Sequence, residues 1–275
     1  MWGTRGSLPS PGPQTVVHGG NTSCVEVRGA DGSCVVLDAG SGIRLLGASA
    51  EARTTRFDLL ITHLHTDHIQ GLGFFNPLYW PEAEIRIWGP PSITLPLRTR
   101  LTRYFSPPFF PAQVRDLPCR LTFHDIPRGS FQIGDLRIDA DFICHPGPTV
   151  GYRITEDGVS MAYMPDHEPA LGVERFPGQS DWTSGYDLAS GANLLIHDAQ
   201  YSDAEYAARV GWGHSSIHHA VAFAAAAHVE RLVTFHHDPA HDDEAVGRLI
   251  QEVEARMPQL PFELISGMEG SSFDV

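Results

Sequence analysis

The sequence predicts an α/β protein with two strand-rich halves, each accompanied by helices. Short apolar runs bounded by glycine and proline dominate the first half, and such runs are typical of strands. In the second half, runs of strand length alternate with longer segments of helical character. No repeat, linker or low-complexity tract divides the 275 residues, so we expect a single domain over residues 1–275.

The first half is expected to begin with a hairpin. Residues 23–28 and 33–37 flank Gly29-Ala30-Asp31-Gly32, which is a turn signal between two strands. Two stretches rich in proline and aromatic residues, 74–81 and 106–111, could line a substrate pocket, form a dimer contact or simply pack as long loops. The other expected elements are a buried strand at 56–61, strands at 84–88, 149–155 and 159–163, successive strands between 120 and 145, and an amphipathic segment at 92–105.

The second half is expected to alternate strands and helices. A helix over 202–209 is predicted to begin at Ser202, whose hydroxyl can cap the first turn. The other predicted helices are 215–228, which has an alanine-rich face, and 242–257. Strands are predicted at 193–196, 231–235 and 262–265.

Three histidines and an aspartate follow the strand predicted at 56–61. His63 and His65 are two residues apart, so on an extended segment they project to the same side and can bind one metal ion together. Asp67 and His68 then lie on a turn into a helix, where they can reach a second ion. A lone histidine would be interpreted as a hydrogen-bonded surface or core residue, but four such residues together predict metal binding. Imidazole and carboxylate ligands suit zinc, and also manganese or iron.

This H-x-H-x-D-H run resembles the signature of the metallo-β-lactamase superfamily, and further His and Asp residues follow later strands in the family's order. The resemblance implies a four-layer αββα sandwich of two mixed β-sheets flanked by helices, with the site at one edge. It also implies two divalent metal ions, with zinc expected and Mn²⁺ or Fe²⁺ compatible. His237 could replace its neighbour His236 as a ligand, although the family register favours His236. The implied ligands are His63, His65 and His145 for the first ion, Asp67, His68 and His236 for the second, and Asp166 for both.

A further pair of motifs indicates which branch of the superfamily the chain resembles. His197-Asp198-Ala199-Gln200 and Gly213-His214-Ser215-Ser216 resemble the paired H-E-A-T and H-S-T motifs of the tRNase Z-like phosphodiesterase branch, with Asp198 where that branch has Glu. The resemblance implies that Asp198 holds His214 in its protonated form, so that His214 can give a proton to a leaving oxygen. Asp67 could also accept a hydrogen bond from the attacking water. As alternatives, His214 could be a structural residue at a helix start, and Asp38 could support the metal site or serve as a turn or N-cap residue.

The charge of the chain limits the substrate. The sequence has 19 Lys and Arg against 33 Asp and Glu, which argues against broad nucleic-acid binding. His145 and Asp166 are 21 positions apart, which leaves no room there for the inserted arm of tRNA-processing members. We therefore expect hydrolysis of a small phosphodiester such as a cyclic nucleotide, and no tRNA substrate. The alternatives are a lactonase or other ester hydrolase of this fold, a β-lactamase with less support, or a non-catalytic ligand-binding relative.

Cysteine usage and hydropathy indicate the compartment. The four cysteines show no C-x-x-C spacing; Cys24 and Cys34 could face each other across the hairpin, but free buried thiols are expected. No apolar run is long enough to span a membrane, and no basic-then-apolar segment opens the chain. A cytoplasmic protein without membrane contact is therefore predicted, and the resemblance is compatible with a homodimer.

Overall fold

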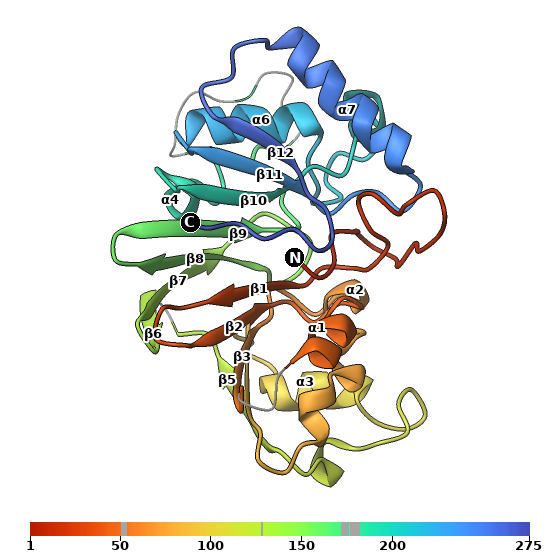
Figure 1. Cartoon of the computed structure of the whole chain (residues 1–275), viewed down its shortest axis with the longest axis vertical. Helices are drawn as coiled ribbons and strands as arrows, with labels where there is room; N and C mark the ends of the chain where they lie inside the picture. The colour runs from red at the N-terminus through yellow and green to blue at the C-terminus, as the bar shows by residue number, and fades with distance from the viewer. Residues whose placement is uncertain (51–53, 128, 172–175, 177–181) are drawn as a thin grey trace.

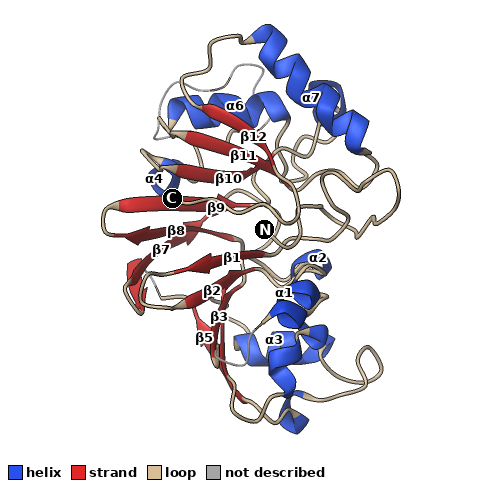
Figure 2. Cartoon of the chain, viewed as in Figure 1, coloured by secondary structure: helices blue, strands red, loops and turns tan. Residues whose placement is uncertain are grey.

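Two β-sheets face each other and carry helices on their outer faces (Figures 1 and 2). This computed structural model describes residues 1–50, 54–127, 129–171, 176 and 182–275. Both sheets are mixed: the strand orders are β1-β2-β3-β4-β5 in one and β12-β11-β10-β9-β8-β7-β6 in the other. The predicted α/β class, with two mixed sheets between helices, is confirmed.

The first sheet contains β1 (Val25–Arg28), β2 (Cys34–Leu37), β3 (Arg56–Leu60), β4 (Glu84–Gly89) and β5 (Arg120–Asp125). β1 and β2 form the expected antiparallel hairpin, and the other neighbours pair in parallel. The hairpin register pairs Arg28 with Cys34, so Cys24 and Cys34 do not face each other. Each of the four cysteines is a free thiol, as expected.

The second sheet contains β6 (Gly129–Ile133), β7 (Leu136–Phe142), β8 (Val150–Glu156), β9 (Val159–Met164), β10 (Leu194–Asp198), β11 (Arg231–Phe235) and β12 (Glu263–Ser266). β6 to β9 form an antiparallel meander, whereas β9 to β12 run parallel. The carboxyl ends of the parallel strands therefore meet at one edge of the sheet. Loops that leave this edge can bring side chains from distant parts of the sequence together.

The helices are α1 (Ile43–Ser49), α2 (Thr66–Ile69), α3 (Leu97–Tyr104), α4 (Tyr186–Ala189), α5 (Asp203–Ala207), α6 (Ile217–Ala226) and α7 (Asp243–Arg256). Three short 3₁₀ turns are η1 (Leu72–Phe74), η2 (Asn76–Tyr79) and η3 (Val114–Asp116). α1 and α3 accompany the first sheet, and α6 and α7 accompany the second (Figure 1). No helix in the described ranges is long and apolar enough to cross a bilayer.

Two helix starts differ from the prediction. α2 begins at Thr66, so Asp67 and His68 lie inside this single helical turn rather than on a turn before it. α6 begins at Ile217, and its N-cap is Ser216, whose hydroxyl accepts the His219 N–H. His214 therefore precedes the helix and is not its N-terminal residue. By contrast, Ser202 caps α5 as predicted, in a reciprocal capping box with Glu205.

Apolar side chains fill the space between the sheets and under the helices. Val35, Tyr152 and Phe235 are fully buried between the two sheets. Fully burying one such side chain contributes about 1.5–3 kcal/mol, so this layer fixes how the sheets face each other. In the two aromatic stretches, Phe75 and Phe110 pack into the core, in line with the loop-packing interpretation, while Phe74 and Phe109 are exposed.

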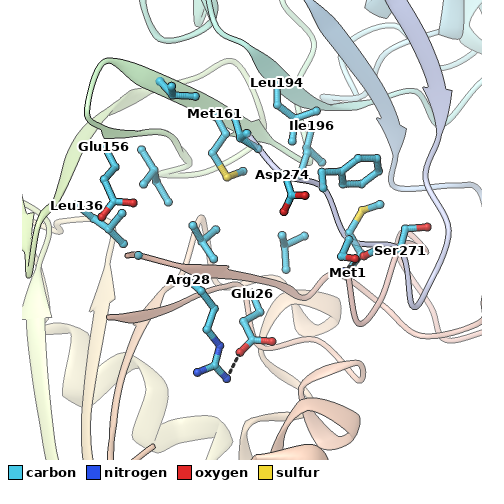
Figure 3. A pocket seen from close by; sticks show the side chains of 18 of the residues that line it. Met1, Glu26, Arg28, Leu136, Glu156, Met161, Leu194, Ile196, Ser271 and Asp274 are labelled. Atoms are coloured by element: carbon cyan, nitrogen blue, oxygen red, sulfur yellow. Dashed lines mark hydrogen bonds and ion pairs between the residues drawn. The ribbon is translucent and has the colours of Figure 1, made fainter. Parts of the chain in front are cut away.

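A cavity of about 790 Å³ lies beside β1, close to both chain ends (Figure 3). Its wall is mainly apolar, with Met161, Leu194 and Ile196 contributed by the second sheet, and Glu26 and Glu156 among its polar lining residues. None of the histidines of the predicted metal site is among its described lining residues. The site suggested by the sequence is therefore elsewhere, at the carboxyl ends of the strands.

Candidate metal centre

The segments that follow β3, β7, β9 and β11, with α2 among them, bring the seven predicted ligands together. Two groups form, and Asp166 belongs to both of them. Within each group, one potential ligand atom of every residue lies within 4.8 Å of those of the others. The groups are His63, His65, His145 and Asp166, and Asp67, His68, Asp166 and His236.

Asp38 orients two of these imidazoles. It lies just after β2, and its carboxylate is fully buried. His68 Nδ1 donates to Asp38 Oδ2 at 2.8 Å, and Tyr163 donates to the same oxygen at 3.0 Å. The Thr62 hydroxyl donates to Asp38 and lies 3.1 Å from His63 Nδ1, from which it can accept. Asp38 therefore supports the site, which was one of the two alternatives, and it caps no helix.

The imidazoles of His145 and His236 are also held by a hydrogen bond at Nδ1. His145 Nδ1 donates to the carbonyl oxygen of Gly213 at 2.8 Å. His236 Nδ1 lies 3.2 Å from Gln200 Oε1, which can accept its proton. A hydrogen bond from Nδ1 fixes the tautomer and leaves the Nε2 lone pair free to bind a metal ion.

Several atoms of the predicted ligands make no hydrogen bond within the described part of the chain. His63 Nε2, His68 Nε2 and Asp166 Oδ1 are buried and find no hydrogen-bond partner among the described residues. A buried polar atom without a partner costs about 1–3 kcal/mol, so such atoms are rare in folded proteins. Yet they lie close together, with His68 Nε2 2.9 Å from Asp166 Oδ1 and His63 Nε2 3.7 Å from Asp166 Oδ2, in a geometry that forms no hydrogen bond. This set of nitrogen and oxygen atoms fits divalent metal ions.

The protonation states also suit a cation. Burial lowers the pKa of His63 well below its ordinary value and that of His145 to about 4, so both imidazoles are neutral. Burial opposes ionisation of Asp166, but the histidines around it, His236 first, hold its pKa well below the ordinary range. Burial likewise opposes protonation of His68, but the nearby carboxylates, Asp166 first, raise its pKa well above the ordinary value. The same negative potential favours a divalent cation.

Asp198 and His214 form a pair beside these groups. His214 Nδ1 donates to Asp198 Oδ2 at 2.6 Å, so the shorter aspartate reaches the histidine. The other oxygen of Asp198 accepts the backbone N–H groups of Ser215 at 3.0 Å and Gln200 at 3.1 Å. Burial lowers the pKa of His214, but Asp198 outweighs it, and the pKa rises to about 9. The His214 ring stacks on the His236 ring, with 4.9 Å between the ring centroids. A protonated imidazole therefore lies next to the two groups of predicted metal ligands.

His237, the alternative to His236, faces another part of the molecule. Its Nε2 lies 2.9 Å from the carbonyl oxygen of Gly267, and its ring contacts His18. Burial lowers its pKa to about 3. His237 is thus a neutral, hydrogen-bonded core residue, whereas His236 Nε2 lies 3.2 Å from Asp166 Oδ1.

Some contacts at the site were not predicted. The backbone N–H of Ser7 donates to Asp67 Oδ2 at 2.8 Å, although the two residues are 60 positions apart. Gln200 belongs to the motif His197-Asp198-Ala199-Gln200, from which no role for this residue is predicted. The position of Gln200, two residues after Asp198, could have indicated a role at the site. No local sequence pattern indicates that Ser7 contacts the site.

Comparisons with known proteins define the family. The family model described as "Beta-lactamase superfamily domain" matches residues 34–237, which is well over half of the chain. The chain therefore belongs to this superfamily and is a metallo-β-lactamase-fold hydrolase.

Individual relatives are more distant. Ribonuclease Z of Mycobacterium marinum is 26% identical over 262 residues, which cover 87% of this chain and 86% of that protein. Human tRNase Z, short form, superposes with a TM-score of 0.66 at 23% identity, over 100% of this chain and 98% of the other. Zn²⁺-bound PqqB from Methylobacterium extorquens gives a TM-score of 0.72 at 16% identity, over 100% and 98%. The two structural likenesses show the fold, and the ribonuclease Z relative weakens the expectation that tRNA is not a substrate.

Proposed function

We propose that the chain is a dinuclear metal-dependent phosphodiesterase acting on small phosphodiesters, such as cyclic nucleotides. The Asp198–His214 pair carries this proposal, because it places a proton donor beside two metal-binding groups. In the proposed assignment, Asp166 would bind both of two ions, preferably zinc. His63, His65 and His145 would hold the first ion, and Asp67, His68 and His236 the second.

The proposed chemistry divides between the ions and the protein. Two bound divalent ions would act as Lewis acids toward a phosphate and lower the pKa of a water molecule toward ~7. His214 keeps Nδ1 on Asp198, so its Nε2 is the atom that can give a proton to the leaving oxygen. With a pKa of about 9, His214 carries that proton at neutral pH. An oxygen of Asp67 can accept a hydrogen bond from the attacking water and so align it.

The size of the substrate rests on two observations. The net charge is −14, which disfavours a long polyanion. Between His145 and Asp166 the chain forms only the hairpin of β8 and β9, so no arm projects from this position. The likeness to ribonuclease Z makes precursor tRNA the competing substrate class. The lactonase alternative uses nearly the same metal ligands and would not need His214.

The test is a substrate panel with a matched variant. Zinc-loaded protein is assayed with 3′,5′- and 2′,3′-cyclic nucleotides, bis(p-nitrophenyl) phosphate, precursor tRNA and a lactone. A general acid typically contributes ~10²–10⁴-fold, so His214→Ala should lower diester turnover by about that factor while two metal ions stay bound. His218→Ala, which alters a contact with Asp203 on the outer helices, is the control. Lactone turnover without diester turnover, unaffected by His214→Ala, would refute the proposal.

A further inference from the structure

Glu168 is a buried carboxylate outside the metal groups. It lies two residues after Asp166, and only 1% of its surface is exposed. Glu168 Oε2 accepts the backbone N–H groups of Gly211 at 3.1 Å and Gly213 at 2.9 Å. Oε1 accepts the Tyr206 hydroxyl at 2.7 Å and the Gly211 N–H at 3.0 Å. Both oxygens are thus used to hold one short loop.

This loop carries His214. Gly211 and Gly213 have φ angles of +87° and +85°, which glycine adopts readily and other residues rarely do. A side chain at Gly213 would also overlap His145 and Pro146, so the loop lies directly against a proposed ligand. The Gly213 carbonyl oxygen accepts the His145 Nδ1 proton, and the next residue is His214. The Glu168 carboxylate therefore holds the backbone on which both histidines depend.

We propose that Glu168 is a positioning residue, which fixes the loop 211–213 and thereby places His214 against Asp198. The role in turnover rests on the proposed function of His214, whereas the placement itself does not. The physical basis is acceptor geometry: a carboxylate offers only acceptors, and the loop N–H groups can only donate, while the Tyr206 hydroxyl donates to Oε1. Gly211 and Gly213 have no side chains of their own to fix them, so the Glu168 contacts hold the loop together with the backbone hydrogen bond from Trp212 to Arg209.

Glu168→Gln tests the proposal with the smallest change in shape. The amide keeps one acceptor but turns an N–H₂ group toward donors, so at least one loop contact is lost. Since displacements of ~1 Å can cost ~10²-fold in rate, we expect kcat for a diester to fall about 10–100-fold, with KM changed less than about 3-fold. Glu205→Gln on the neighbouring helix is the matched control, because Glu205 caps α5 and contacts His241 without touching the loop.

Two readouts separate positioning from general stability. Backbone hydrogen exchange should accelerate at Gly211 and Gly213 in Glu168→Gln and stay unchanged in Glu205→Gln. A crystal structure of Glu168→Gln should show His214 Nδ1 moved away from its 2.6 Å contact with Asp198. Unchanged exchange and an unchanged contact would overturn the proposal, whether or not any diester is hydrolysed.

A double variant, Glu168→Gln with His214→Ala, tests whether Glu168 affects turnover through His214. If Glu168 acts through His214, the loss of kcat caused by Glu168→Gln should be nearly absent when His214 is already alanine. Fully additive losses would show that Glu168 acts by another route and would overturn the link. Wild-type protein that hydrolyses no diester would refute the proposed function, while the exchange and crystallographic results would still decide the placement of the loop.

Discussion

Several of the proposed ligand histidines are oriented by a hydrogen bond to a residue that is not itself a proposed ligand. His68 depends on Asp38, His63 on Thr62, and His236 on Gln200. These contacts hold Nδ1 and direct Nε2 into the site, so they restrict the orientation of each ring. Preorganisation of this kind raises metal affinity because little rearrangement is needed.

Asp38→Asn tests this orientation. The amide can present N–H₂ to donors where the carboxylate accepted from His68, Thr62 and Tyr163. Loss of such a partner typically lowers metal affinity by about 10–100-fold, and we expect that range for the ion held by His68. Competition with a chelator of known affinity measures it. Asp31→Asn, in an exposed turn, is the control, and equal zinc affinity in both variants would contradict the account.

The residues of the site differ in how far the sequence predicts them. His63, His65, Asp67 and His68 are close neighbours in one motif, so their spacing alone indicates a metal site. Glu168, by contrast, acts through glycines more than 40 positions away, and a buried carboxylate leaves no local pattern. Contacts of this kind depend on how the loops fold back, which no periodicity encodes.

At the scale of elements, short segments between strands carry the chemistry. The strands for which bounds were predicted agree with the structure to within one or two residues, because buried strands read as apolar runs, as in β3 and β11. α2 was misplaced because a helix of one turn has no periodicity to detect. The contact between the N-terminal loop and the segment of His236 could not be predicted from the sequence, because Gly6 and His237, which share a backbone hydrogen bond, are far apart in the chain.

Gly6→Ala tests the packing of this N-terminal loop. A Cβ at Gly6 would overlap the His236 imidazole, whose Nδ1 contacts Gln200. Either the loop or the ring must move, and we expect the zinc content to fall from about two ions to about one per chain because His236 is a proposed ligand of the second ion. Gly12→Ala is the control, since a Cβ there meets no described atom within 4 Å. Two tightly bound zinc ions in Gly6→Ala would contradict this assignment.

At the scale of the molecule, buried histidines couple folding to pH. Burial lowers the pKa of His197 to about 4 and that of His237 to about 3, against about 6.5 in an unfolded chain. The unfolded state therefore binds more protons between these values, and the stability from these residues is lost as the pH falls below 6.5. For His214, Asp198 raises the folded pKa to about 9, so its stability is lost as the pH rises from 6.5 through 9.

Metal-free protein should accordingly be most stable near pH 6.5. Each unit of pKa shift corresponds to about 1.4 kcal/mol, so the free energy of unfolding should fall by a few kcal/mol between pH 6.5 and 5. Urea unfolding at pH 5, 6.5 and 8.5 measures the trend. His214→Ala should flatten the decrease above pH 6.5, and a steady rise in stability to pH 8.5 in the unaltered chain would contradict the prediction.

The most direct measurement is a zinc titration of metal-free protein, with hydrolysis of bis(p-nitrophenyl) phosphate followed at each step. Because Asp166 belongs to both groups, the proposed site needs two ions to be complete. We therefore expect little turnover up to one equivalent of zinc, and a steep rise that ends at two equivalents. Full turnover at one equivalent would contradict the dinuclear assignment, and no turnover with two ions bound would contradict the proposed phosphodiesterase activity.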